Sequence, residues 1–322
     1  MQGFKILPFL FIFFLFAACK DEYKEFKETP SYIANPTMQQ EAYFEAYDKV
    51  LQKWDVKYEE LYISTSHGIA HVIVSGPKKA VPLVLLHGIN ASSTMWYPNA
   101  KALTEEYRIY AIDLIVEPGK SLKTADFKNI DDLTDWYQEV LWALKLDSFH
   151  IIGASRGGWL AVNFALKSKR DIKSLVLLSP AQTFVWIPPS TGLLKTIVNV
   201  FSSDEKQVEG TLETMSSRPG NIDRDYVEQY HLSKKNDTLT KFMMEMTPFS
   251  NRDLQTLKMP VLVLIGDDDM INTKRAIRLA EKHIPRGQGE IISNAGHFLS
   301  VDQAKTVNKK ILDFLRSVDN AK

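Results

Sequence analysis

The sequence predicts an α/β fold, with a mostly parallel central sheet flanked by helices and a helical insertion late in the chain. Three observations predict it. Short apolar runs recur along the chain, as in strands that are covered on both faces. Segments with helical spacing separate these runs, and strands that alternate with helices form parallel sheets. Residues 180–259 interrupt the alternation, because they contain helix-like segments and prolines but no apolar strand run.

The bulk composition is that of a globular protein. The chain has 322 residues and 45% hydrophobic content, enough for one large core or for a core with a small appended domain. Its 39 basic residues balance 39 acidic ones, so we expect no nucleic-acid partner, which would need a concentrated positive surface. We expect no metal or organic cofactor, because no cluster of His, Cys or Glu has ligand spacing. The sequence carries no signal for an oligomeric state.

The N-terminus has the parts of a secretory signal. Lys5 is followed by an apolar run from Ile6 to Phe16, and two alanines then precede Cys19. The run is shorter than the roughly 20 residues that cross a bilayer. Cys19 is the only cysteine of the chain, so no internal disulfide can form.

The position of Cys19 resembles the lipobox of bacterial lipoproteins. That resemblance implies that residues 1–18 are a signal peptide, that Cys19 is lipidated, and that the protein is anchored to the cell membrane outside the cytoplasm. The alternatives are an uncleaved membrane anchor and a plain secretion signal with an incidental cysteine. Residues 19–37 are polar and charged, which indicates a tether to the folded body.

The remaining elements follow in order. An amphipathic helix is expected over 41–54, and a β-hairpin over 61–74. The expected strands are 83–86, 109–112, 149–152, 175–178, 261–265 and 290–292. The expected helices between and after them are 96–105, 131–144, 159–169, 274–283 and 302–318. The core is thus predicted in two parts, 38–179 and 260–322, around a helical cap over 180–259 that lies at the carboxyl edge of the sheet.

A candidate nucleophile follows the strand predicted over 149–152. The segment Gly153-Ala154-Ser155-Arg156-Gly157 reads G-x-S-x-G between this strand and a predicted helix. A serine on such a sharp turn is exposed above the sheet, and its neighbours must be glycine because a Cβ would clash. A hydroxyl is a weak nucleophile, so the site also needs a base, an orienting acid and an oxyanion hole.

Loops after three other predicted strands carry groups that can supply these functions. His87-Gly88-Ile89-Asn90 follows the strand 83–86, so the backbone N–H groups of Ile89 and Arg156 can form an oxyanion hole. Asp267-Asp268-Asp269 follows the strand 261–265, and His297 follows the last strand. Taken singly, each feature has a structural alternative: the His-Gly segment is a turn that ends a strand, the three aspartates are a solvated turn, and His297 is a surface or packing residue. Together they bring a hydroxyl, an imidazole and a carboxylate to one edge of the sheet.

The order Ser155, Asp269, His297 is the one described for α/β-hydrolases. From Leu83 to Leu315 the chain resembles an α/β-hydrolase of the serine esterase type with a helical cap. Over roughly residues 40–316 it is similar to the bacillar carboxylesterases of the naproxen-ester hydrolase group. The segments that carry this resemblance are Tyr62-Ile63-Ser64-Thr65, Ser75-Gly76-Pro77-Lys78, Met95-Trp96-Tyr97-Pro98-Asn99, Tyr110-Ala111-Ile112-Asp113 and Asn294-Ala295-Gly296-His297.

The resemblance implies that Ser155 is the nucleophile, His297 the general base and Asp269 the acid, with Asp267 and Asp268 as alternatives. It implies a serine carboxylesterase that hydrolyses a small-molecule ester by two-step acyl transfer. A lactonase, an amidase, a cofactor-free haloperoxidase or perhydrolase, and an inactive ligand-binding lipoprotein are the alternatives. Arg156 departs from the group, which has an apolar or amide residue there. Its guanidinium either pairs with a buried carboxylate or favours acidic substrates.

Overall fold

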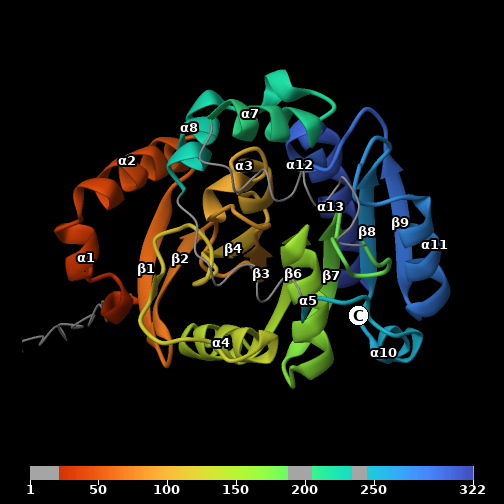
Figure 1. The fold of residues 1–322 in the computed structure, drawn as a ribbon. Helices are drawn as coiled ribbons and strands as arrows, with labels where there is room; N and C mark the ends of the chain where they lie inside the picture. The colour runs from red at the N-terminus through yellow and green to blue at the C-terminus, as the bar shows by residue number, and fades with distance from the viewer. Residues whose placement is uncertain (1–21, 188–204, 234–244, 322) are drawn as a thin grey trace, which may run out of the picture.

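The computed structural model describes residues 22–187, 205–233 and 245–321, and its centre is one twisted sheet (Figure 1). The order of the strands is β1-β2-β4-β3-β6-β7-β8-β9, and the short β5 pairs with β2. β1 and β2 form an antiparallel hairpin, β2 pairs antiparallel with β4, and all pairs from β4 through β9 are parallel. The strands are β1 Tyr58–Thr65, β2 Gly68–Ser75, β3 Val81–Leu86, β4 Tyr107–Ile112, β5 Leu122–Lys123, β6 Ser148–Ala154, β7 Asp171–Leu178, β8 Val261–Gly266 and β9 Gly287–Ile292. The predicted α/β class with a mostly parallel sheet is therefore confirmed.

Helices cover both faces of the sheet, and the strands divide their side chains between the two faces. Val84 and Leu86 of β3 join one buried cluster, with α4 Ile130–Ala143, α5 Arg156–Lys167 and α11 Lys274–His283. Leu83 and Leu85 join the other, with α2 Met38–Gln52, α3 Ala100–Thr104 and α13 Ala304–Asp319. This alternation follows from the period of two along a strand, so the apolar run needs helices on both sides.

Capping residues set where several helices begin. The Thr37 side chain accepts from the Gln40 N–H and forms a capping box at the start of α2. The Asn129 side chain accepts from two N–H groups at the start of α4.

Two of the helices that we predicted are interrupted. The helix predicted over 96–105 is a 3₁₀ turn, η2 Ser93–Trp96, followed by α3, because Pro98 lies between them. The helix predicted over 302–318 is α12 Leu299–Asp302 followed by α13.

The described parts of the insertion lie at two ends of the sheet. α7 Glu205–Thr214 and α8 Arg224–Leu232, joined through η3 Pro219–Asn221, cross the upper ends of the strands in Figure 1. α10 Asn251–Thr256 lies instead beside α11, and Leu254 and Leu257 belong to a main core cluster. The last residues of the segment predicted as a cap, 180–259, thus pack with the core.

The segment before α2 differs from the expected tether over 19–37. Its described residues include η1 Lys24–Phe26 and α1 Ser31–Ala34, both packed on the body. Tyr23 is only 4% exposed, and its hydroxyl lies 3.0 Å from the Tyr110 hydroxyl. The Tyr32 hydroxyl donates to the Lys120 carbonyl at 2.6 Å. Three aromatic rings, of Tyr23, Phe26 and Tyr32, give this polar segment enough apolar surface to pack. The signal peptide predicted over 1–18 and Cys19 lie outside the described residues.

Candidate active site

Ser155 stands on the turn between β6 and α5, in a backbone conformation that few side chains adopt. Its φ is 51° and its ψ is −115°. The turn is tight on both sides. A Cβ at Gly153 would lie 2.3 Å from the Gly157 carbonyl oxygen, and one at Gly157 would lie 2.2 Å from the Leu86 carbonyl oxygen. Both positions therefore require glycine, as the sequence predicted, and the serine is held at the carboxyl end of the sheet.

The side chains of Ser155, His297 and Asp269 form one chain of hydrogen bonds. The distance from His297 Nε2 to Ser155 Oγ is 2.9 Å, and from His297 Nδ1 to Asp269 Oδ1 it is 3.0 Å. A carboxylate only accepts, so Nδ1 carries the proton and Nε2 is left to accept from the serine hydroxyl. His297 is 6% exposed and Asp269 is 9% exposed, so water competes little with either bond.

Further donors keep Asp269 ionised. Its Oδ1 also accepts from the Ile271 N–H at 2.8 Å, and its Oδ2 accepts from the Asn272 amide at 3.2 Å. Burial alone would raise the pKa of the Asp269 carboxyl, but the charge and hydrogen bond of His297 and the Ile271 N–H hold that pKa below its usual value.

The neighbouring aspartates have other partners. Asp267 Oδ1 accepts from the Ala295 N–H at 3.1 Å and so fixes the loop that precedes His297. Asp268 is exposed and accepts from the Ser217 hydroxyl at 3.1 Å. Among the three alternatives from the sequence, Asp269 is the one whose carboxylate contacts His297.

The loop after β3 lies directly beside Ser155. A Cβ added at Gly88 would be 3.5 Å from the Ser155 Cβ, which places Gly88 next to the serine side chain. His87 is buried, and burial lowers the pKa of its imidazole, which is therefore neutral. Its Nε2 accepts from the Leu114 N–H at 2.8 Å, so the proton is on Nδ1 and is donated to the Gly88 carbonyl at 2.9 Å.

Two backbone N–H groups at this edge have no acceptor among the described residues: those of Ile89 and Arg156. Arg156 is the first residue of α5, and the first N–H groups of a helix have no partner within it. This is the arrangement expected of an oxyanion hole, with one donor from the loop and one from the serine turn.

The Arg156 side chain turns into the protein and pairs with Glu117. The guanidinium Nη1 contacts the Glu117 Oε1, and both side chains are almost completely buried. The sequence left two roles open for the Arg156 guanidinium, and in the structure it pairs with a buried carboxylate. Burial raises the pKa of Glu117 to about 7, and the Arg156 charge and the Asn90 N–H oppose that rise.

Three residues that hold the site together were not predicted from the sequence: Glu117, Gln229 and Asp302. Gln229 of α8 accepts from Thr94 at 2.8 Å and donates to Ser92 at 2.9 Å, which fixes the insertion over η2. Asp302 accepts from the Gly296 N–H at 2.7 Å, directly before His297. An acidic residue that ends the apolar run 114–116 was the one available signal for Glu117.

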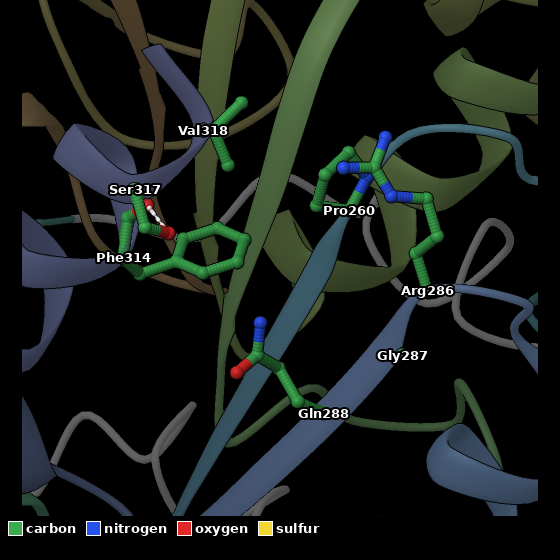
Figure 2. Close-up of a pocket in the computed structure, with 7 residues that line it drawn as sticks. All are labelled: Pro260, Arg286, Gly287, Gln288, Phe314, Ser317 and Val318. Carbon is green, nitrogen blue, oxygen red and sulfur yellow. Dashed lines mark hydrogen bonds between the residues drawn. The ribbon is translucent and has the colours of Figure 1, made fainter. Parts of the chain in front are cut away.

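A cavity of about 290 Å³ lies at the opposite end of the sheet from Ser155 (Figure 2). It is formed by the amino ends of β8 and β9 and by the end of α13. The residues that line it are Pro260, Arg286, Gly287, Gln288, Phe314, Ser317 and Val318. None of them is a nucleophile paired with a base, so this cavity is separate from the candidate active site.

Two kinds of feature are absent from the described residues, 22–187, 205–233 and 245–321. In these parts of the chain, no group of three or more His, Cys, Asp or Glu side chains is placed to hold a metal ion. No helix among them is both long and apolar enough to cross a membrane.

The chain matches the family described as the alpha/beta hydrolase fold over residues 81–304. It is 31% identical over 280 residues to carboxylesterase YbfK of Bacillus subtilis, covering 85% of this chain and 93% of that protein. It is 33% identical over 284 residues to the carboxylesterase nap of the same organism, covering 85% of this chain and 92% of that protein.

A solved structure agrees with these sequence matches. The naproxen esterase (carboxylesterase NP) of Bacillus subtilis superposes with a TM-score of 0.80 at 32% identity, covering 87% of this chain and 99% of that chain. The family match spans the strand before the loop His87–Asn90, the serine turn and His297. The chain therefore belongs to the alpha/beta hydrolase fold family, and it is an enzyme of the serine hydrolase class.

Proposed function

We propose that the protein is a serine carboxylesterase that hydrolyses a small-molecule carboxylic ester through Ser155, His297 and Asp269. The observation that carries this proposal is the continuous chain of hydrogen bonds Asp269–His297–Ser155, which ends beside two N–H groups that have no acceptor among the described residues. A hydroxyl that lies 2.9 Å from an imidazole nitrogen can be deprotonated by it as it attacks a carbonyl.

In the first step, Ser155 Oγ bonds to the ester carbonyl carbon while His297 Nε2 takes the hydroxyl proton. The N–H groups of Ile89 and Arg156 donate to the oxygen that becomes negative. The Asp269 carboxylate holds the imidazole orientation and stabilises its positive charge. The bond from carbon to the alcohol oxygen then breaks, and His297 returns the proton to the departing alcohol.

In the second step, water attacks the acyl group on Ser155. His297 removes a proton from the water, and the same two N–H groups hold the second oxyanion. Collapse of this intermediate breaks the bond to Ser155 Oγ, which regains its proton from His297 and releases the carboxylic acid. No step requires a metal or an organic cofactor.

The substrate class rests on the relatives. The two Bacillus subtilis relatives at 31% and 33% identity are carboxylesterases, which favours an ester over a lactone, an amide or a peroxide substrate. The fold and the three side chains are shared by those other chemistries, so they do not separate them.

The test combines covalent labelling with an ester panel. We expect a fluorophosphonate probe to label the wild type at Ser155, and the protein to hydrolyse p-nitrophenyl esters of short acids. Ser155→Ala should lose the label and about 10⁶-fold in kcat, as expected when a nucleophile is removed. An unlabelled wild type that turns over no ester in the panel would mean an inactive, ligand-binding protein.

We also propose that the mature protein begins at a lipidated Cys19 and is anchored to the outer side of the cell membrane. The sequence supports this through the short apolar run, the two small residues and the single cysteine. Anchoring would make the membrane a partner of the protein, besides the small ester.

A further inference from the structure

Buried ion pairs are costly to form, so the one between Arg156 and Glu117 calls for a reason. Removing two charges from water costs several kcal/mol per ion, and a well-packed apolar pair is often as stable. The Arg156 and Glu117 side chains are 2% and 0% exposed. The Nε and Nη2 groups of Arg156 have no acceptor among the described residues, so Glu117 is the partner that compensates the guanidinium there. The pair must therefore provide something other than stability.

The second oxygen of Glu117 points to what the pair provides. While Oε1 contacts Arg156, Oε2 accepts from the Asn90 N–H at 2.8 Å. Asn90 has a positive φ of 52°, a left-handed conformation that asparagine adopts more readily than most other residues with a side chain. The ion pair thus holds the backbone of the loop that follows β3.

This contact fixes one of the two peptide planes on either side of Ile89. The Asn90 N–H belongs to the plane after Ile89, and Glu117 holds that plane. The Gly88 carbonyl belongs to the plane before it, and His87 holds that one. In a trans peptide the N–H points opposite to the carbonyl, so the Ile89 N–H lies in the plane before Ile89 and points away from the Gly88 carbonyl. The two planes meet at the Ile89 Cα, so the hold of Glu117 on the plane after Ile89 limits how far the plane before it can rotate.

We propose that Arg156 and Glu117 are positioning residues, whose ion pair orients the Ile89 N–H in the oxyanion hole. This rests on the proposed esterase function. Arg156 contributes through two separate groups: its own backbone N–H is one oxyanion donor, and its side chain aligns the other through Glu117 and Asn90. Loss of Arg156 would leave the Glu117 carboxyl buried without its partner and favour its neutral form, which accepts the Asn90 hydrogen bond less strongly.

The experiment uses three variants of the full chain and one control. Glu117→Gln and Arg156→Met each break the pair, and the double variant removes both charges, so that no unpaired ion is left inside the protein. The control is Asn163→Ala, which lies in the same helix α5 as Arg156 but away from the site. It removes a buried hydrogen bond of 2.8 Å from the Asn163 amide to the Thr134 hydroxyl. The readouts are Tm, kcat and KM on p-nitrophenyl butyrate, and the Ki of a trifluoromethyl ketone, whose adduct places an oxyanion in the hole.

We expect kcat of all three variants to fall about tenfold to a hundredfold with little change in KM, because a misaligned donor costs less than the about 10²–10³-fold of a deleted one. The ketone Ki should rise by the same factor as kcat/KM falls. The double variant should be no slower than the slower single variant, since the two residues act as one unit. Asn163→Ala should lower Tm while kcat stays within about twofold.

Two results would overturn the inference. One is a folded double variant that keeps kcat and the ketone Ki within about twofold of the wild type. The other is a double variant whose fold loss in kcat equals the product of the fold losses of the two single variants, because the two residues would then act independently. If Glu117→Gln or Arg156→Met fails to fold, the double variant alone decides. A wild type without esterase activity would instead overturn the proposed function, which keeps the two failures distinct.

Discussion

At the scale of single residues, the three aspartates after β8 show how neighbours in sequence acquire different tasks. Asp267 binds the Ala295 N–H, Asp268 contacts Ser217 at the surface, and Asp269 contacts His297. A strand and the tight turn after it point successive side chains in different directions, so only one of three adjacent carboxylates can reach the imidazole.

We predict that Asp269→Asn lowers kcat on p-nitrophenyl butyrate by about 10³–10⁴-fold, with little effect on KM. An amide can donate to Nδ1, which would favour the imidazole tautomer with its proton on Nε2, and that tautomer cannot take the proton of Ser155. Asp268→Asn is the matched control, because it changes the adjacent exposed carboxylate, and it should stay within about twofold. A large loss in Asp268→Asn and none in Asp269→Asn would reverse the assignment.

The sequence placed Ser155, His297 and Asp269 at one edge of the sheet because each lies in the turn or loop that follows an apolar strand. The carboxyl ends of parallel strands meet at one edge, so residues far apart in the chain had to converge there. Glu117 was not predicted to pair with Arg156. Their contact depends on how α5 and the loop after β4 pack, and no local pattern records that packing.

At the scale of elements, Asp302 of α12 connects the insertion to the loop of His297. Its Oδ2 accepts from the N–H groups of Gly296 at 2.7 Å and of Ser217 at 3.0 Å, and its Oδ1 contacts the Ser216 hydroxyl. The Phe298 N–H donates to the Met215 carbonyl at 3.1 Å beside them. The first part of the insertion is thus bonded to the segment that carries the imidazole.

We predict that Asp302→Ala lowers both Tm and kcat, whereas Asp302→Asn keeps most of each. Alanine leaves two N–H groups without an acceptor, at about 1–3 kcal/mol for each buried group. Asparagine keeps an oxygen for them and turns its amide toward Ser216. Thermal unfolding and kcat on p-nitrophenyl butyrate check this. Equal kcat in all three proteins would show that the connection to the insertion does not position His297.

Most elements were predictable, and the errors have physical causes. The strands agree because apolar runs between polar loops have few other solutions in a sheet covered on both sides. α10 was assigned to the cap because Leu254 and Leu257 have helical spacing whether they pack on the core or on the insertion. Residues 19–37 were interpreted as a tether from their polar and charged composition, and the described residues among them pack through a few aromatic side chains.

At the scale of the whole molecule, a buried cluster of charges joins α2, the first hairpin and the loops after β4. His71 Nδ1 lies 2.8 Å from Asp113 Oδ2, and its Nε2 lies 2.9 Å from Glu60 Oε2. Both nitrogens must donate, so the ring is an imidazolium. Two more groups complete the cluster. Lys120 Nζ donates to Glu60 Oε2 at 2.7 Å, and the Tyr47 hydroxyl donates to Asp113 Oδ2 at 3.0 Å.

This cluster should make stability depend on pH. Burial lowers the pKa of His71, but Asp113 and Glu60 raise it above its model-peptide value of 6.5. Its contribution is therefore full below pH 6.5 and is lost as pH rises through the folded-state pKa. Burial raises the pKa of Glu60, but His71 and Lys120 lower it from 4.5 to about 2, so its contribution is full above pH 4.5 and is lost toward pH 2.

We therefore predict that the cluster stabilises the fold most between about pH 4.5 and 6.5. The measurement is the Tm of wild type and of His71→Gln at a series of pH values. The difference in Tm should be largest in this window and shrink at higher pH, where the wild-type imidazole loses its charge. A difference that stays constant with pH would show that His71 does not carry the charge.

The proposed lipid anchor also constrains how the whole molecule would lie at the membrane. Cys19 comes four residues before the buried Tyr23 in the sequence, and four residues span at most about 14 Å. The Tyr23 hydroxyl contacts the Leu144 carbonyl, which precedes the amino end of β6, while Ser155 follows its carboxyl end. Tyr23, the first buried residue after the proposed attachment point, and the candidate active site thus lie toward opposite ends of β6, so an anchored body would direct the site away from the bilayer.

We predict from this geometry that the anchored protein hydrolyses esters dissolved in water and not those embedded in its own membrane. Mass spectrometry of the purified protein should find an acylated Cys19 at its N-terminus, and Cys19→Ala should lose the acyl group. The acylated protein in vesicles should have the same kcat on p-nitrophenyl butyrate as a soluble chain that begins at residue 20, because the anchor is remote from Ser155. It should gain no turnover on a long-chain ester placed in the same vesicles. Faster hydrolysis of that embedded ester by the anchored form would mean that the site faces the bilayer. An N-terminus without an acyl group would overturn the lipoprotein proposal and favour a secretion signal or an uncleaved anchor.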